Sequence, residues 1–118
     1  MKLSFPISRS LCVVGLLACA TLGVSSLASA QDAKKGEEVY TAQKCSTCHS
    51  IAGKGGKTFP LDGVGGKLSA ADIKEWIVDP PAAIKKHNST KKPPMPNRYA
   101  KLPAGDIDSL VAYMASLK

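Results

Sequence analysis

The sequence is poor in aromatic side chains, with one Trp, three Tyr and two Phe among its 118 residues. A chain of this length forms one small domain at most. A small domain with few aromatics buries little apolar surface and usually needs a disulfide, a metal or a cofactor to be stable. The hydrophobic fraction of 44% excludes a disordered chain. We therefore expect one domain that holds something besides protein.

Charged residues are absent from positions 11–27, which follow Lys2 and Arg9 and precede Ala28-Ser29-Ala30. A basic start, an apolar middle and small residues at a cleavage site are typical of a secretory signal peptide. We therefore predict that residues 1–30 are removed on export to the periplasm.

Cleavage at this point would leave residues 31–118, an 88-residue domain with two of the four cysteines and a net charge lowered from +7 to +5. Two alternatives stay open. The apolar run is nearly long enough to remain as a membrane anchor, and Leu16-Leu17-Ala18-Cys19 resembles a lipoprotein cleavage box that would leave Cys19 lipidated. The main prediction is a soluble monomer with no membrane span after cleavage.

A strand-like alternation of apolar and polar residues is missing from the predicted domain, whereas helical spacing recurs. Residues Asp32–Lys44 place Gly36, Val39 and Tyr40 on one face. This spacing predicts a first helix that ends directly before two cysteines.

Further helices have recognisable start and stop signals. Ser69 and Asp72 form a capping-box pattern, and Pro80 ends that helix. A short helical turn is expected over residues 81–87. The last helix begins between Pro103 and Asp106 and should pack on the first, because its apolar residues recur at helical spacing. The predicted fold class is all-α, with three to five helices joined by long loops.

Two of these loops are rich in residues that break regular structure. Residues 51–67 hold six glycines and Pro60, and residues 88–100 hold three prolines around Met95. Structureless loops of this length usually belong to a functional site.

The strongest motif is Cys45-Ser46-Thr47-Cys48-His49, which has the C-x-x-C-H pattern of c-type haem attachment. Two cysteines three positions apart on one helical turn can each add to a vinyl group of the porphyrin, and the adjacent histidine then becomes an axial ligand of the iron. One covalent haem c would also supply the core that the aromatic-poor sequence lacks.

Three other interpretations of the two cysteines lack the residues they need. A thioredoxin-type redox motif belongs in an α/β fold. A zinc site needs further ligands, but the mature chain has no other cysteine, and His87 is its only other histidine. A plain disulfide is the third of these interpretations.

The order of features over residues 31–118 resembles a small class I c-type cytochrome. The resemblance rests on the haem-attachment motif together with the following residues: Gly36, Tyr40, Pro60, Trp76, Pro94-Met95-Pro96 and Tyr113. It implies that Met95 is the second axial ligand and that the carbonyl of Pro60 accepts the ring N–H of His49. It also implies that Gly36 and Tyr40 pack against the region of Tyr113.

The residues alone leave the second axial ligand open among Met95, Met114 and His87. Met114 falls on the apolar stripe of the last helix, where methionine usually packs in a core. His87 stands among lysines and Asn88, which suggests a solvated surface residue. Met95 lies in a polar loop with no core to account for it, so His49 and Met95 are the predicted iron ligands.

Such a ligand pair predicts a one-electron carrier with no catalytic residues. A thioether favours ferrous iron, and two protein ligands leave no open position for a small molecule. The carrier would shuttle electrons between periplasmic or membrane redox partners. The alternatives are a haem subunit of a larger oxidase or dehydrogenase complex and a haem enzyme or gas-binding protein with a labile Met95.

Acidic residues are absent from residues 80–105, although six basic residues lie there: Lys85, Lys86, Lys91, Lys92, Arg98 and Lys101. This cluster of charge predicts docking onto acidic patches of redox partners. Nucleic acid is not an expected partner, because the chain is exported and has no nucleic-acid-binding motif. Trp76, Arg98 and Tyr99 are candidate hydrogen-bond donors to the haem propionates.

Overall fold

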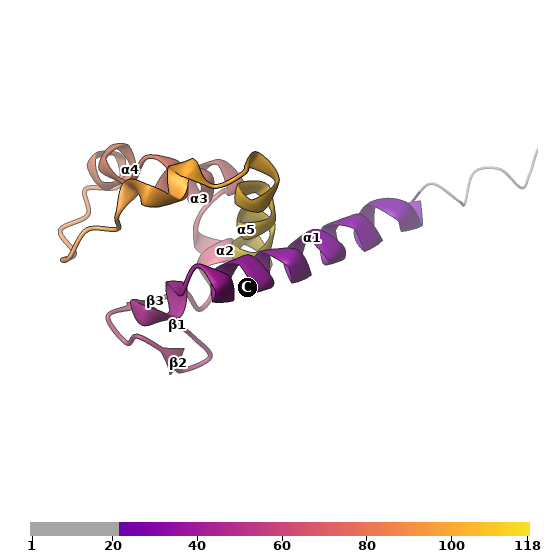
Figure 1. Ribbon diagram of the computed structural model, residues 1–118, viewed down its shortest axis with the longest axis horizontal. Coiled ribbons are helices and arrows are strands. Elements are labelled where there is room, and N and C mark those ends of the chain that lie inside the picture. The colour runs from indigo at the N-terminus through magenta and orange to yellow at the C-terminus, as the bar shows by residue number, and fades with distance from the viewer. Residues whose placement is uncertain (1–21) are drawn as a thin grey trace, which may run out of the picture.

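The computed structural model describes residues 22–118 (Figure 1). Residues 1–21, which hold Cys12, Cys19 and most of the predicted signal peptide, lie outside the described part. Helices dominate the rest and confirm the all-α fold class. In chain order the elements are α1 (Leu22–Ala42), η1 (Cys45–Thr47), β1 (His49–Ile51), β2 (Lys54–Gly55), β3 (Phe59–Pro60), α2 (Val64–Lys67), α3 (Ala70–Val78), α4 (Pro80–Lys86), η2 (Asn97–Lys101) and α5 (Ala104–Ser116).

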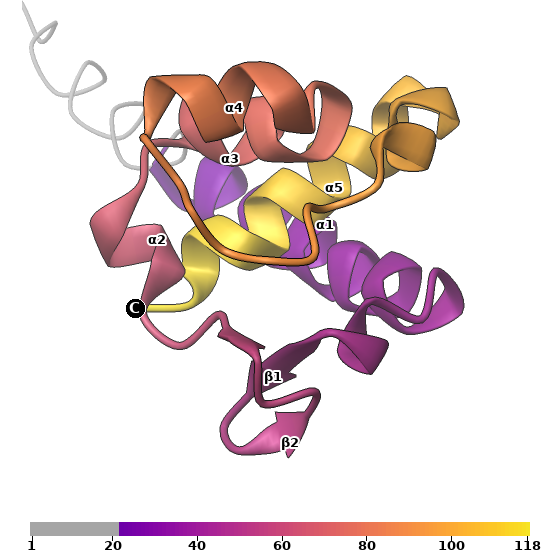
Figure 2. The same cartoon turned by 90° about the vertical axis from the view of Figure 1, so that its left-hand side faces the viewer.

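Helix α1 packs across α5, as the sequence predicts (Figures 1 and 2). The contact is closest at Gly36, where a Cβ atom would overlap the carbonyl oxygen of Ser109 and lie 2.6 Å from Cβ of Tyr113. One turn later, the rings of Tyr40 and Tyr113 meet edge to face, with centroids 5.8 Å apart. The absence of a side chain at Gly36 therefore lets the two helices approach closely enough for the tyrosines to pack.

Helix α1 is longer than predicted, since its described part begins at Leu22 and not at Asp32. Residues 22–31 contain no proline and a single glycine, so nothing in them breaks a helix before Asp32. The helix ends at Ala42, and Lys44 takes the left-handed backbone conformation (φ 55°) that turns the chain into the cysteine motif. Within residues 22–118, no helix combines the length and the apolar character that crossing a membrane requires.

The predicted capping box starts α3. The Ser69 hydroxyl accepts a hydrogen bond from the Asp72 backbone N–H at 3.1 Å and donates one to the Asp72 carboxylate at 2.6 Å. The helix ends at Val78, where Asp79 caps α4 by accepting from the Ala82 N–H at 3.2 Å. Pro80 at the first position of α4 explains why α3 stops there.

The hydrophobic core joins α1, α3, η2 and α5. Its buried residues are Tyr40, Ile73, Ile77, Tyr99, Ile107, Leu110 and Met114. Met114 therefore packs in the core, as its place on the apolar stripe of the last helix predicts.

The glycine-rich segment, for which the sequence predicts a loop, contains a small sheet and the short helix α2. The strand order of the sheet is β2-β1-β3, with β1 antiparallel to β2 and parallel to β3. Strands of two or three residues are too short to show an alternating pattern, and they arise from backbone pairing alone. Gly55, at φ 110°, lets β2 approach β1, because a Cβ there would overlap the carbonyl oxygen of His49.

Candidate cofactor site

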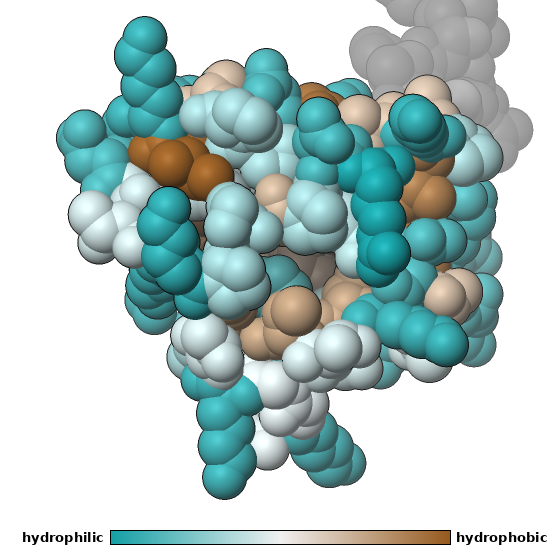
Figure 3. All heavy atoms as spheres, turned by 60° about the vertical axis from the view of Figure 1, so that its left-hand side comes forward, coloured by the Kyte–Doolittle hydropathy of each residue, from teal (hydrophilic) through white to brown (hydrophobic). Residues whose placement is uncertain are grey.

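A cavity of about 780 Å³ opens on one side of the domain. Figure 3 shows the hollow on this face, with apolar surface inside it and hydrophilic side chains at its rim. Its walls come from the cysteine motif, the small sheet, helices α2 to α5 and the loop between α4 and η2. In Figure 2 this loop passes in front of α5.

All the predicted site residues line this single cavity, although they come from separate parts of the chain. They are Cys45, Cys48, His49, Pro60, Trp76, Met95, Arg98 and Tyr99. The fold therefore brings them together, while their individual roles toward a cofactor remain predictions.

The two cysteines are held by the 3-10 turn η1, in which the Cys48 N–H bonds the Cys45 carbonyl at 3.2 Å. Both thiols are free, with Cys45 half-buried and Cys48 exposed. Burial raises the pKa of the Cys45 thiol, although a backbone hydrogen bond and Arg98 oppose this effect. A redox-active C-x-x-C instead needs a cysteine of lowered pKa. The environment of Cys45 thus argues against a thioredoxin-type motif.

The His49 ring is oriented by the small sheet. Its Nδ1 lies 3.0 Å from the carbonyl oxygen of Phe59. The predicted acceptor was the carbonyl of Pro60, and that prediction is wrong. The parallel register pairs His49 with Phe59 and Ser50 with Pro60, so the carbonyl one residue earlier lies beside the ring.

This hydrogen bond leaves one nitrogen of His49 available as a ligand. A carbonyl oxygen can only accept, so Nδ1 carries the proton, and in the neutral ring Nε2 keeps its lone pair. Burial lowers the pKa of His49, with the bond to Phe59 opposing it, and so favours the neutral ring. An imidazole whose other N–H is fixed by a carbonyl is the usual arrangement of a metal-binding histidine.

Met95 has contacts with the core that the sequence did not predict. It is half-buried and packs against the core cluster, in addition to lining the cavity. The prolines on either side of it are exposed. The expectation that Met95 has no core contact is therefore wrong, because the loop folds back over the body of the domain.

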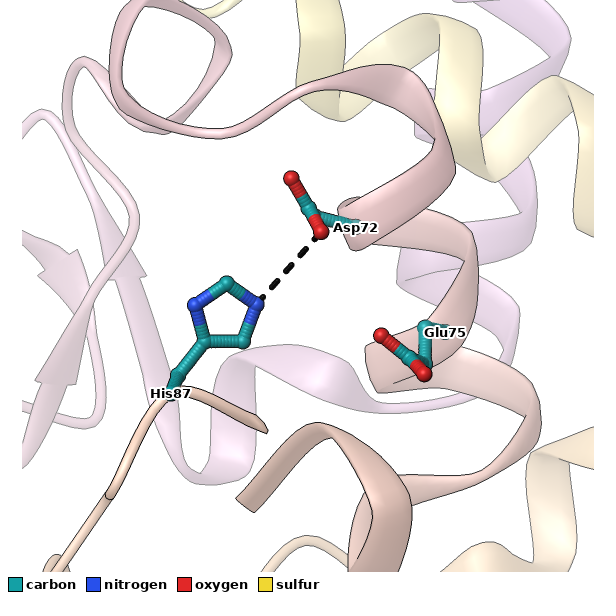
Figure 4. Close-up of side chains that lie close together, drawn as sticks. All are labelled: Asp72, Glu75 and His87. Atoms are coloured by element: carbon teal, nitrogen blue, oxygen red, sulfur yellow. Dashed lines mark ion pairs between the residues drawn. The ribbon is translucent and has the colours of Figure 1, made fainter. Parts of the chain in front are cut away.

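His87 is not the solvated surface residue that its neighbours suggested. Its side chain is 28% exposed, its ring stacks on Trp76 with centroids 5.9 Å apart, and it lines the cavity. Figure 4 shows the ring facing the carboxylate of Asp72, whose Oδ1 lies 3.6 Å from Nε2. The buried Nε2 has no hydrogen-bond partner in the described part of the chain.

Asp72, Glu75 and His87 form the one group of three potential metal ligands among residues 22–118, with ligand atoms within 4.8 Å of one another. The ammonium of Lys86 already bonds both carboxylates, at 2.8 Å to Asp72 and 3.0 Å to Glu75. The cluster is thus an ion-pair network that ties α4 to α3. Neither cysteine belongs to this group.

Arg98 and Tyr99 form a pair at the cavity wall. The Arg98 guanidinium donates to the Tyr99 hydroxyl at 2.9 Å and lies 4.9 Å from the centre of that ring. The Tyr99 side chain is buried, and Arg98 is exposed. The pair presents a fixed positive charge to the cavity, which suits an acidic group of a bound molecule.

Of the six predicted surface cations, Lys86 is engaged in ion pairs and Arg98 in the bond to Tyr99. Lys85, Lys91, Lys92 and Lys101 are exposed. Lys44, which lies outside residues 80–105, joins Lys91 and Arg98 among the residues that line the cavity.

Three other contributors to the site were not predicted. The Phe59 carbonyl leaves no sequence signal because its place depends on strand register, and the Tyr40 hydroxyl, which donates to the His49 carbonyl at 3.3 Å, leaves none because its place depends on how α1 meets β1. An apolar wall is supplied by the glycine-rich segment and α2, through Leu61, Val64 and Leu68. Apolar residues within a glycine-rich stretch were the signal that could have indicated this wall.

The residues fit a covalent haem, because free thiols, an imidazole with one available nitrogen and a thioether line a mainly apolar cavity. A comparison with protein families agrees with this fit, since the family described as cytochrome c matches residues 33–118. No curated protein and no solved structure shows a match to the chain.

Proposed function

Because the chain belongs to the cytochrome c family, we propose that it is a one-electron carrier whose haem is attached to Cys45 and Cys48 and ligated by His49 and Met95. Membership implies a covalently bound haem c and electron transfer as the general function. The observation that carries the residue assignment is that both thiols, His49 and Met95 line the same cavity. The haem supplies an iron that alternates between the ferrous and ferric states.

The chain's own residues then hold that iron in a constant environment. The Phe59 carbonyl fixes the His49 ring, and packing against the core cluster restrains the half-buried Met95. Two protein ligands leave no position for oxygen or peroxide, and a thioether raises the potential relative to a second histidine. Both effects favour outer-sphere electron transfer over bond chemistry.

All three candidate ligands line the cavity, and Met95 is supported over the other two by their surroundings. Met114 is 7% exposed and belongs to the buried core of α5. The Nε2 atom of His87 lies 3.6 Å from a carboxylate oxygen of Asp72. Met95 lies in the loop between α4 and η2, where it is half-buried between two exposed prolines.

Substitution of each candidate ligand tests this assignment. In Met95→Ala we expect a lower midpoint potential and carbon monoxide binding by the reduced protein at neutral pH, which the unaltered protein should resist. Met114→Leu conserves volume in the core and serves as the control, with an unchanged potential. An unaltered potential in Met95→Ala, together with a changed one in His87→Ala, would show that His87 is the ligand. Carbon monoxide binding by the unaltered protein would favour an enzyme or a gas-binding protein.

We also propose that the chain acts in the periplasm after loss of residues 1–30. The signal-like sequence supports this, and the family match begins at residue 33, just after the proposed boundary. The intact mass of the exported protein measures the cleavage site and covalent haem together. We expect a chain beginning at Gln31 with one haem. A lipid-modified Cys19 or a retained leader would contradict the boundary, and a mass without haem would contradict the attachment.

A further inference from the structure

We propose that the Tyr40 hydroxyl is a positioning group for His49, which connects the packing of α1 on α5 to the orientation of this ligand. The inference rests on the proposed role of His49 as an axial ligand. It concerns the hydroxyl alone, as distinct from the aromatic ring that packs between the helices.

The hydroxyl has a defined direction because the ring that carries it is held firmly. Tyr40 is 8% exposed and belongs to the core cluster. Its ring meets Tyr113 edge to face at 5.8 Å, with an interplanar angle of 68°. From this position the hydroxyl reaches past the end of α1 and donates to the carbonyl oxygen of His49 at 3.3 Å.

His49 is thereby held at two separate points. The Phe59 carbonyl fixes its side chain through Nδ1, at 3.0 Å, and the Tyr40 hydroxyl fixes its backbone carbonyl. The bond to Phe59 restrains the ring only relative to β3. Rotation of the peptide group after His49 would still move its Cα and tilt the imidazole. The bond from Tyr40 opposes that rotation in addition to the pairing of β1 with β2 and β3, so both bonds act on the plane of the ring.

The donor role of Tyr40 persists at every physiological pH. Burial, followed by the nearby Cys45 and Tyr113, raises its pKa to about 12. The hydroxyl therefore keeps its proton, and the carbonyl of His49 can only accept. The bond consequently does not depend on the titration of either group.

A simpler interpretation is that Tyr40 contributes only its ring, as part of the contact between α1 and α5. Tyr40→Phe separates the two interpretations because it keeps the ring and removes the hydroxyl. Tyr113→Phe is the matched control. It makes the same chemical change on the partner ring, whose hydroxyl makes no hydrogen bond within the described residues.

The test compares the unaltered haem-loaded protein with both variants. In the oxidised state, the hyperfine-shifted NMR signals of the haem methyl groups report the orientation of the axial imidazole. We expect their pattern to change in Tyr40→Phe and to stay unchanged in Tyr113→Phe. Identical patterns in all three proteins would overturn the proposal.

Hydrogen exchange provides a second readout that a general loss of stability would not reproduce. The Leu61 amide donates to the carbonyl of Ser50, the residue after His49, at 2.8 Å, and the Asp79 amide donates to Glu75 in the distant helix α3. At 3.3 Å the bond from Tyr40 is longer than most O–H···O bonds, so its loss corresponds to about a twofold change in an opening equilibrium. Tyr40→Phe should therefore accelerate exchange at Leu61 about twofold and leave Asp79 unchanged. Equal acceleration at both amides would indicate packing alone and contradict the proposal.

The result also distinguishes this inference from the proposed function. If the unaltered protein shows no hyperfine-shifted signals from the His49 ring, His49 is not the ligand and both proposals fail. If those signals are present and Tyr40→Phe leaves the methyl pattern unchanged, only the role of the Tyr40 hydroxyl fails.

Discussion

Gly36 of α1 lies directly against the backbone of Ser109 in α5, leaving no room for a side chain between the two helices. Ser109 is 4% exposed, and its own hydroxyl bonds back to the carbonyl of Gly105 at 2.8 Å. The contact is therefore between two backbones, which cannot move aside as a flexible side chain could. It sets the spacing of α1 and α5 and, through α1, the place where the cysteine motif begins.

Gly36→Ala should consequently destabilise the folded protein. The added Cβ overlaps the Ser109 carbonyl, and overpacking of this kind costs about 1–3 kcal/mol. Gly66→Ala is the control, because Gly66 lies in α2 with no atom within 4 Å of the added Cβ. We expect that control to be neutral or slightly stabilising, since alanine suits a helix better than glycine does. Denaturant unfolding measures both changes, and equal free energies of unfolding would contradict the account of the α1–α5 contact.

Gly56→Ala should disturb the haem-attachment motif. A Cβ at this position would lie 2.5 Å from the carbonyl oxygen of Thr47 and 2.9 Å from Cα of Cys48. Either the motif or the loop must then move, so we expect a smaller fraction of chains with haem attached and a shifted midpoint potential. Gly53→Ala is the control in the same loop, because its Cβ meets nothing within 4 Å and only its φ of 76° is strained. If the two variants gave the same yield and potential, the close approach of Gly56 would not matter for the site.

Lys86→Met should weaken the connection between α3 and α4. It removes the ion pairs to Asp72 and Glu75 but keeps the length of the side chain. The matched control is Lys85→Met on the same helix, since Lys85 makes no ion pair within residues 22–118. Exposed ion pairs contribute little to the free energy of unfolding and are screened by salt. We therefore expect Lys86→Met to lower the melting temperature slightly, by an amount that decreases as salt is added. A drop that salt does not change would indicate lost packing by the lysine stem.

The same network predicts how stability responds to acid. Hydrogen bonds from Lys86 and then Ser69 hold the pKa of the Asp72 carboxyl below its usual range. Because the folded pKa is the lower one, the unfolded chain takes up a proton first. The contribution of the ionised Asp72 carboxylate to the free energy of unfolding is then complete at neutral pH and is lost as the pH falls below about 4. Melting temperatures recorded against pH should show the difference between Lys86→Met and Lys85→Met shrinking in this range, and a difference that persists in acid would contradict the assignment.

The cations at the cavity rim should govern reactions with small redox reagents. Lys44, Lys91 and Arg98 line the cavity. Oxidation of the reduced protein by hexacyanoferrate(III), an anion, should slow as ionic strength rises, and oxidation by a cationic cobalt(III) phenanthroline complex should accelerate. Lys91→Glu should slow only the first reaction. Lys34→Glu, which changes the net charge equally on α1, is the control because Lys34 does not line this cavity. Equal effects of both substitutions would mean that net charge alone matters.

Much of the fold was predictable because its signals are local. Ser69 and Asp72 lie three residues apart and cap α3 wherever that helix is placed. Pro80 separates α3 from α4, and the apolar stripe that includes Leu110 and Met114 specifies the buried face of α5. Each signal acts within a few turns of one helix, so the sequence is enough to read it.

Two of the wrong predictions concern contacts between residues that are ten or more positions apart in the chain. The acceptor of the His49 ring N–H depends on whether β1 pairs with Phe59 or Pro60, and two-residue strands carry no pattern that fixes this register. His87 became half-buried through Trp76 and Asp72, eleven and fifteen positions earlier in the chain. The burial of His87 was therefore predicted wrongly from its neighbours in the sequence, because it depends on its neighbours in space.

Residue type and spacing alone predicted α3, α4, α5, the cap of α3 and the C-x-x-C-H pattern of Cys45, Cys48 and His49, because these signals are local. Contacts between separate segments establish that Met95 folds back onto the core, that the carbonyl of Phe59 and not of Pro60 bonds the His49 ring, and that Lys86 is held in ion pairs. These outcomes depend on how α1, α5 and the small sheet meet. The close backbone contact at Gly36, which the resemblance to class I cytochromes implies, sets part of that geometry because it fixes how near α1 and α5 lie.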